Sequence, residues 1–276
     1  MRLAMCNEGF ESEPLDGAFD SLARAGYTGV ELAPFTLGAD PDQLTKADRG
    51  KIRAMAHDRS LSITGLHWLL ARTRGMHVSA DDAATERRTL RYLRALTELC
   101  SDLGGEVLVF GSPGQRSTPS GMSVDAARER ALQTFRAWAS VAEQVGVTVC
   151  LEALPAEETD FMNTTAEVVG VVEVIGSPAL RMVLDVKSMS AERTPIPELI
   201  DLAAPHLAYV QANDANRRGP GFGDTDFVPI FTALSSVGYD GWVSVEAFDF
   251  RPGVEEMAVA SRQYLTSAAK KARVNL

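Results

Sequence analysis

The feature that most constrains the fold of this chain is its regular alternation between short apolar runs and longer segments of helical periodicity. Short apolar runs are typical of strands buried on both faces, whereas apolar residues spaced three or four apart mark one face of a helix. The sequence predicts strands at residues 3–6, 30–32, 61–66, 107–110, 147–152, 181–185, 207–211 and 242–246. It predicts helices at residues 15–25, 42–57, 80–103, 125–145, 165–175, 196–203, 227–236 and 254–272.

A closed parallel barrel is the fold class that best accommodates these paired strands and helices. The strands are apolar throughout rather than alternating, and no stretch has the composition of a linker between domains. Residues 3–9 contain a single glycine, Gly9, so the glycine pattern of a dinucleotide-binding fold is missing. We therefore expect an α/β protein that forms a single (β/α)8 TIM barrel domain over residues 1–276.

Four of the predicted strands end on a polar side chain, namely Glu152, Asp185, Gln211 and Glu246. A carboxylate that ends a strand this apolar is costly to bury unless it has a partner. In a barrel, the carboxyl ends of all strands meet at one face, which is where catalytic groups lie. The pattern therefore predicts that the four side chains share one divalent cation.

The composition excludes several classes of partner. A net charge of -10 and a pI near 5.0 argue against binding of nucleic acid, because phosphate recognition needs a concentrated basic face. The three cysteines are odd in number and far apart, which is typical of a reducing compartment. No apolar run has membrane-spanning length and the N-terminus does not read as a signal peptide, so we expect a cytoplasmic protein without a membrane partner.

The sequence resembles the xylose-isomerase-like TIM barrels, a family of sugar phosphate isomerases and epimerases, over nearly the whole chain. The likeness is carried by residues 26–32, Gly-Tyr-Thr-Gly-Val-Glu-Leu, and by residues 238–246, Gly-Tyr-Asp-Gly-Trp-Val-Ser-Val-Glu. In that family a metal is bound at the ends of strands five to eight. The resemblance thus implies the metal ligands Glu152, Asp185, Gln211 and Glu246.

Position 211 departs from the family, which usually has histidine there. The segment 211–214, Gln-Ala-Asn-Asp, followed by Arg217, is similar to the hydroxypyruvate isomerase branch, which also uses glutamine. The ketose 3-epimerase branch is the other close likeness. An amide oxygen in place of an imidazole nitrogen makes the donor set all oxygen, which favours Mn²⁺, with Mg²⁺ or Co²⁺ as alternatives.

The resemblance also implies a mechanism and a small carbohydrate substrate. Two substrate oxygens bind the cation, which acidifies the neighbouring C–H and stabilises the enediolate formed on deprotonation. Glu152 and Glu246 act as the base and acid pair on opposite sides of the substrate, and Arg217 donates to substrate oxygens.

Other candidate substrate-binding residues have two interpretations each. Glu158 either binds substrate or is a solvated loop carboxylate, and Lys187 is either a site residue or the ion-pair partner of a neighbour. His67 and Trp68, after the third strand, either face the site or pack structurally. Arg116, on the fourth loop, reads as a surface arginine.

Relatives commonly have a histidine where this chain has Ser188. Either Lys187 or His67 takes over its role, or the reaction is a different one. Three functions stay open: a metal-dependent isomerase or epimerase of a small sugar, keto-sugar or hydroxy-keto acid; a lyase that dehydrates keto-inositols or eliminates from 3-keto-glycosides; and a non-catalytic sugar-binding protein. The family implies a homodimer or homotetramer.

Overall fold

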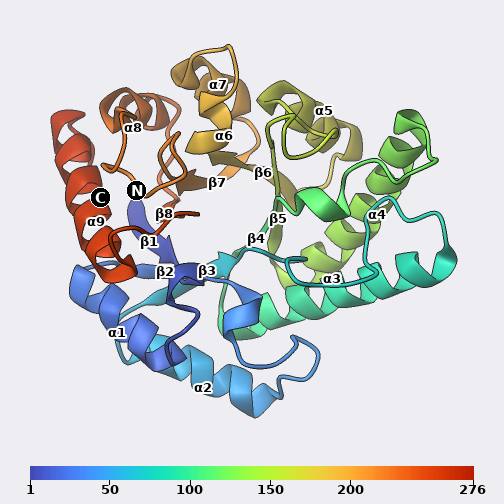
Figure 1. Cartoon of the computed structure of the whole chain (residues 1–276), viewed down its shortest axis with the longest axis horizontal. Coiled ribbons are helices and arrows are strands. Elements are labelled where there is room, and N and C mark those ends of the chain that lie inside the picture. Colours follow the sequence, from blue (N-terminus) through green and yellow to red (C-terminus); the bar gives the residue numbers. More distant parts are fainter.

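The computed structural model describes residues 1–276, and its centre is a closed barrel of eight parallel strands in chain order (Figure 1). This confirms the predicted TIM barrel. The strands are β1 (Arg2–Cys6), β2 (Gly29–Leu32), β3 (Ser62–Leu66), β4 (Val107–Phe110), β5 (Thr148–Glu152), β6 (Leu180–Asp185), β7 (Leu207–Ala212) and β8 (Trp242–Val245). β8 pairs with β1 and closes the ring.

Helices surround the barrel on the outside (Figure 1). They are α1 (Leu15–Ala25), α2 (Lys46–His57), α3 (Ala83–Leu103), α4 (Val124–Val145), α5 (Thr165–Ile175), α6 (Val186–Ser190), α7 (Ile196–Ala203), α8 (Phe227–Ser236) and α9 (Val254–Lys271). Three short 3-10 helices lie in the loops after β1, β2 and β4. No helix combines the length and the apolar composition that crossing a membrane requires.

Capping explains where the predicted helix starts were wrong. α2 begins at Lys46 rather than at residue 42, because the side chain of Thr45 accepts from the backbone N–H of Asp48 in a capping box. α3 begins at Ala83 rather than at residue 80, because Asp82 caps it. α6 was not predicted at all, since five residues are too few to show helical periodicity.

The interior of the barrel explains how the site is positioned. A small apolar cluster fills it, and includes Cys150 on β5, Val183 on β6 and Tyr209 on β7. Side chains two residues apart on a strand point to the same face. Glu152, Asp185 and Gln211 each lie two residues beyond a member of this cluster, so the strand period itself aims them into the mouth of the barrel.

The termini lie side by side on the α9 side of the barrel (Figure 1). The amino group of Met1 donates to the carbonyl of Asn275 at 3.1 Å. This hydrogen bond joins the two ends of the chain beside α9.

Candidate active site

The four predicted metal ligands lie together at the carboxyl end of the barrel, and all are almost inaccessible to solvent. Their exposed fractions are 4% for Glu152, 2% for Asp185, 0% for Gln211 and 1% for Glu246. Asp185 and Gln211 are register partners across β6 and β7. Glu246 follows the last residue of β8, and its backbone N–H donates to the carbonyl of Ala212 at 3.1 Å.

Asn213 ties two of these carboxylates together. Its side-chain Nδ2 donates to Oδ2 of Asp185 and, at 3.2 Å, to Oε2 of Glu246. Its Oδ1 accepts from the backbone N–H of Lys187 at 2.7 Å, and the other oxygen of Asp185 accepts from the N–H of Ser188. This network fixes the positions of two acidic groups that would otherwise repel each other.

In the side-chain amide of Gln211, the NH₂ group has hydrogen-bond partners and the oxygen has none. Its Nε2 lies 3.0 Å from Nδ1 of His67 and 3.4 Å from both carboxylate oxygens of Glu31. Its Oε1 is buried and has no hydrogen-bond partner. Buried amide oxygens are nearly always satisfied, so an unpartnered one among carboxylates is the pattern expected of a metal ligand.

The electrostatics of the site favour a cation strongly. Burial raises the pKa of Glu152 to about 8, and the charge of Asp185 adds to the rise. Burial likewise raises the pKa of Glu246 well above its usual range, with Asp185 and Glu152 as the next contributors. Each of these carboxylates is held in its charged form only at a free-energy cost, which a bound cation or a proton would remove.

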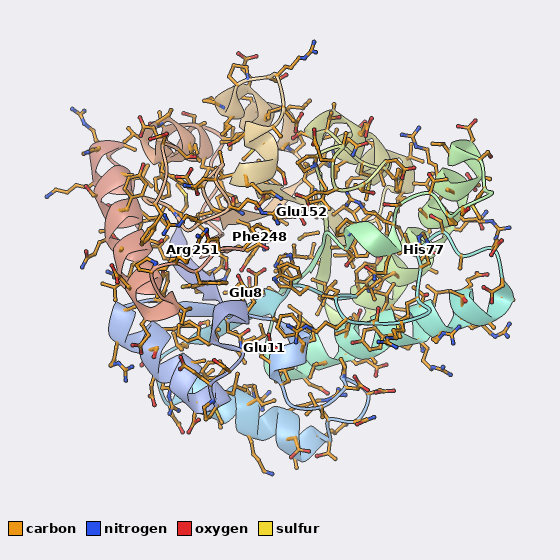
Figure 2. The ribbon with its side chains drawn as sticks, in the orientation of Figure 1. Glu8, Glu11, His77, Glu152, Phe248 and Arg251 are labelled. Atoms are coloured by element: carbon orange, nitrogen blue, oxygen red, sulfur yellow. The ribbon has the colours of Figure 1, made fainter.

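A cavity of about 320 Å³ opens at these side chains, and Glu152 and Glu246 form part of its lining. Figure 2 shows Glu152, Phe248 and Glu8 gathered over the ring of strands, with His77 well away from them towards α3 and α4. The cavity lining contains Glu152, Glu246 and all five predicted substrate-binding residues, namely His67, Trp68, Glu158, Lys187 and Arg217. Their roles towards a substrate remain predictions.

Lys187 and Glu158 form an ion pair in the wall of the cavity. Nζ of Lys187 donates to Oε1 of Glu158 at 2.8 Å, so the lysine is an ion-pair partner as well as part of the cavity lining. Burial works to lower the pKa of Lys187, but nearby carboxylates, Asp185 first, outweigh burial and raise it. The lysine is therefore a fixed positive charge in the cavity wall.

Phe248 connects the two cations of the cavity. Nζ of Lys187 lies 4.8 Å from the centroid of its ring, and the guanidinium carbon of Arg217 lies 4.9 Å from it. Trp68 packs edge-on against the same ring, with 5.8 Å between centroids. Arg217 is exposed and belongs to the cavity lining, and its guanidinium makes no hydrogen bond or ion pair within the chain.

His67 lies at the floor of the cavity rather than packing only in the core. It is 5% exposed, and its Nδ1 lies 3.5 Å from Oε1 of Glu246. Burial lowers the pKa of His67 to about 3, with Lys187 adding to the effect. The imidazole is therefore neutral, which suits a hydrogen-bonding role better than a role as a general acid.

The interpretation of Arg116 as a surface arginine was wrong. It is 0% exposed, and its guanidinium donates to the backbone carbonyl of Glu152 at 2.7 Å and to that of Met162 at 3.0 Å. Burial lowers the pKa of Arg116 to about 10. Nothing in the residues around Arg116 in the sequence signals this burial, because both of its partners are distant backbone groups.

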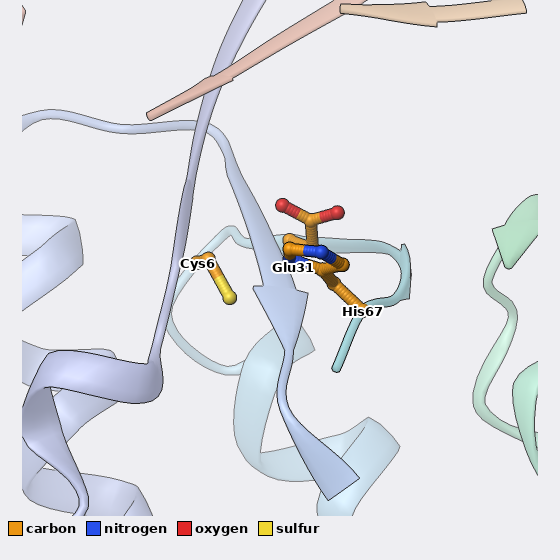
Figure 3. A group of neighbouring side chains, drawn as sticks. All are labelled: Cys6, Glu31 and His67. Carbon is orange, nitrogen blue, oxygen red and sulfur yellow. The ribbon is translucent and has the colours of Figure 1, made fainter. Parts of the chain in front are cut away.

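A second cluster of ligand-type side chains lies beside the predicted one. The side chains of Cys6, Glu31 and His67 lie together (Figure 3), with their ligand atoms within 4.8 Å of one another. The three predicted carboxylates are not that close to one another. Burial raises the pKa of the Cys6 thiol well above its usual range, and the carboxylate of Glu31 already accepts from Ser244. Glu31 also lies near the amide of Gln211, and His67 bonds to that amide, so both already have partners outside the cluster.

The largest cavity, about 840 Å³, lies in the loops after β2 and β3 and against α3. Its lining includes four arginines, at 72, 74, 88 and 91, but none of the predicted site residues. The chemistry of the strand ends, and not the size of the cavity, therefore identifies the candidate site.

A closed barrel that gathers buried carboxylates and a free amide oxygen at the carboxyl ends of its strands defines a TIM-barrel enzyme. Comparison with known proteins makes this more specific. The family model of the xylose isomerase-like TIM barrel matches residues 19–268. This chain belongs to that family.

The most informative relatives are named sugar epimerases and isomerases. A D-psicose 3-epimerase from Ruminiclostridium cellulolyticum is 35% identical over 233 residues, which cover 83% of this chain and 76% of that protein. A putative hydroxypyruvate isomerase from Streptomyces coelicolor is 26% identical over 266 residues, covering 92% and 91%. The solved structure of a D-psicose 3-epimerase in the presence of D-fructose shares the fold, with a TM-score of 0.85, 21% identity and 99% coverage of both chains. The chain is thus an enzyme of the sugar isomerase and epimerase class.

Proposed function

We propose that this protein is a divalent-metal-dependent epimerase of a small ketose, and that it inverts the carbon next to the carbonyl. The observation that carries the proposal is the buried, unpartnered Oε1 of Gln211 beside three buried carboxylates. The name of the 35% identical relative, a D-psicose 3-epimerase, supports C3 of a ketose as the first position to examine.

The residues present fit a hard divalent cation. Glu152, Asp185, Gln211 and Glu246 would hold it and would supply only oxygen donors, for which Mn²⁺ is the first candidate and Mg²⁺ or Co²⁺ the alternatives. The second amide, on Asn213, already separates two of the carboxylates by donating to both. When bound, the cation would polarise the two substrate oxygens beside the reacting carbon and stabilise the negative charge of the enediolate.

Proton transfer is the task of the two glutamates. Glu152 and Glu246 come from β5 and from the end of β8, three positions apart around the barrel, and both line the same cavity. One removes the proton from the substrate carbon, and the other returns a proton to the opposite face, which inverts the centre. Removal and return by the same residue would leave the configuration unchanged.

The remaining lining residues would orient the sugar. Arg217 offers unused donors, and the Lys187–Glu158 pair offers one donor and one acceptor to substrate hydroxyl groups. Both candidates for the role of the family histidine line the cavity: Lys187, which precedes Ser188 in the sequence, and His67. We assign the role of the family histidine to Lys187, because the imidazole of His67 already bonds to Gln211.

A second candidate is the isomerisation of a hydroxy-keto acid. The observation that favours it is the guanidinium of Arg217, which lines the cavity without a carboxylate partner and would bind a substrate carboxylate well. The relative named as a putative hydroxypyruvate isomerase covers 92% of this chain. A lyase on the same scaffold would share the deprotonation step, whereas a purely sugar-binding protein has no support among the names of the relatives.

The test is a product panel on the purified protein with Mn²⁺. Ketopentoses, ketohexoses, hydroxypyruvate and a 3-keto-glucoside are incubated separately, and products are identified by NMR and mass. A ketose product of unchanged mass with inverted C3 supports the epimerase, and tartronate semialdehyde from hydroxypyruvate supports the isomerase. A product lighter by one water, or a cleaved glycoside, would replace both with the lyase. Size-exclusion chromatography of the same sample tests the predicted homodimer or homotetramer.

A further inference from the structure

The barrel interior directly beneath the site contains a carboxylate, Glu31, that the proposed mechanism does not use. It lies on β2, is 0% exposed, and contacts Gln211 of β7, three strands away around the barrel. We infer that Glu31 is a positioning residue that fixes the amide of Gln211 with its oxygen turned towards the metal site. The inference rests on the proposed function, because it concerns the same metal site.

A glutamine ligand has a problem that a histidine ligand does not have. Its amide has two ends of nearly equal size, and rotation about the last side-chain bond exchanges them. The oxygen can bind a hard cation, whereas the NH₂ group cannot. A chain with glutamine at this position therefore needs something that selects one of the two orientations.

The contacts around Gln211 provide that selection. Both oxygens of the Glu31 carboxyl group lie 3.4 Å from Nε2. In the metal-bound protein a nearby cation favours the ionised form of Glu31, and an ionised carboxylate can only accept hydrogen bonds. The flipped amide would place its oxygen against this carboxylate and lose the attraction. Nδ1 of His67, at 3.0 Å, takes the second N–H, so the NH₂ group is fully used and Oε1 is left over.

Glu31 is itself held in place, which is what a positioning residue requires. The hydroxyl of Ser244 on β8 donates to its Oε2 at 2.8 Å. The carboxylate and the ring of His67 lie together at the ends of neighbouring strands (Figure 3). Complete burial prevents water from competing for these hydrogen bonds.

The test compares two isosteric variants that each remove one buried negative charge beside the site. Glu31→Gln removes the group that selects the amide orientation, because the new amide can pair with either end of Gln211. Glu8→Gln is the matched control: Glu8 contacts the site through Ala247, whose N–H donates to its Oε1 at 3.2 Å, and it does not contact Gln211. A glutamine at position 8 keeps an acceptor for that N–H.

The readout is the affinity for Mn²⁺ by titration calorimetry, with the melting temperature of the metal-free protein as a check of folding. We expect Glu31→Gln to weaken Mn²⁺ binding by about 10–100-fold, the range typical of residues that orient a metal ligand. We expect Glu8→Gln to weaken it several-fold less, and both metal-free variants to melt no lower than the wild type.

The same substitution in a Gln211→Glu variant separates an effect on orientation from an effect of charge. In Gln211→Glu, both ends of the side chain are oxygen atoms, so there is no orientation left to select. Adding Glu31→Gln to that variant should therefore leave Mn²⁺ affinity unchanged or increase it, by relieving the repulsion between two carboxylates. A reversal of the effect between the two backgrounds separates orientation from a simple change of charge.

Failure of the proposed metal site and failure of the positioning role of Glu31 give different results. If the wild type binds no Mn²⁺, Mg²⁺ or Co²⁺, the proposed function fails and the inference fails with it. If the wild type binds Mn²⁺ but Glu31→Gln and Glu8→Gln weaken it equally, the metal site stands and the positioning role of Glu31 is overturned.

Discussion

The guanidinium of Arg116 holds the backbone carbonyl of Glu152 at 2.7 Å, from a position with no exposure to solvent. The same guanidinium donates to Met162 across the loop that follows β5. Burying an arginine without a carboxylate partner costs free energy. We therefore attribute its presence to the two backbone carbonyls that it holds in place.

The first prediction concerns this arginine. Arg116→Met removes two buried hydrogen bonds from a charged donor, each worth about 1.5–3 kcal/mol, and relief of the buried charge offsets part of the loss. The carbonyl of Met162 keeps the backbone N–H of Leu154 as a donor. We expect the free energy of unfolding to fall by about 2–4 kcal/mol in urea denaturation. The control is Arg74→Met: this exposed arginine makes no hydrogen bond or ion pair, and its loss should change stability by less than about 0.5 kcal/mol. Equal stability of the two variants would show that Arg116 holds nothing.

The second prediction is that the proposed catalytic carboxylates reduce stability. Glu246→Gln keeps an acceptor for Asn213 but removes one of several mutually repelling buried charges. The metal-free variant should therefore be more stable than the wild type by about 1 kcal/mol, or about 2–4 °C in melting temperature, while losing turnover. Calorimetry of both metal-free proteins checks this, and a lower melting temperature in the variant would contradict it.

The third prediction is a dependence of stability on pH. The pKa of Glu152 and that of Glu31 are raised by burial from 4.5 to about 8. Groups with a raised folded-state pKa stabilise the fold fully below their unfolded pKa, and this contribution is lost as the pH rises through the folded pKa. The melting temperature of the metal-free protein should therefore fall between about pH 5 and pH 8, and stabilisation by Mn²⁺ should grow over the same range. A flat or rising profile would mean that these carboxylates are not buried as described.

The fourth prediction separates substrate binding from metal binding. Lys187→Met removes the ion pair with Glu158 and the positive charge in the cavity wall, but it leaves the backbone N–H that donates to Asn213. We expect KM to rise about tenfold or more, with little change in Mn²⁺ affinity. Steady-state kinetics and calorimetry check the two halves, and a loss of metal affinity instead would place Lys187 in support of the ligands.

The fold could be predicted from sequence because its signals are local. The strands of the barrel are largely apolar runs, and in four of them a polar residue at the end shows where the chain leaves the core. Their position at the ends of strands predicted that Glu152, Asp185 and Gln211 meet at one end of the barrel. Cys150 and Tyr209 lie beneath them, two residues earlier on β5 and β7.

The supporting residues could not be predicted because their partners are distant in sequence. Glu31 is 180 residues from Gln211, and no local pattern distinguishes it from an ordinary strand residue. Asn213 was noted only as part of a motif, although its amide donates to two carboxylates. Arg116 bonds to backbone carbonyls, which leave no trace in side-chain identity. Such contacts depend on how the barrel closes, and only the structure supplies that information.

The most direct test of the central claim is the exchange of a substrate proton with solvent. The Mn²⁺-loaded protein is incubated in D₂O with the best ketose of the product panel, and deuterium at the carbon next to the carbonyl is measured by NMR. We predict incorporation that requires the metal and disappears in Glu246→Gln. Epimerisation without deuterium, or incorporation that persists after removal of the metal, would contradict proton transfer at a metal-stabilised enediolate.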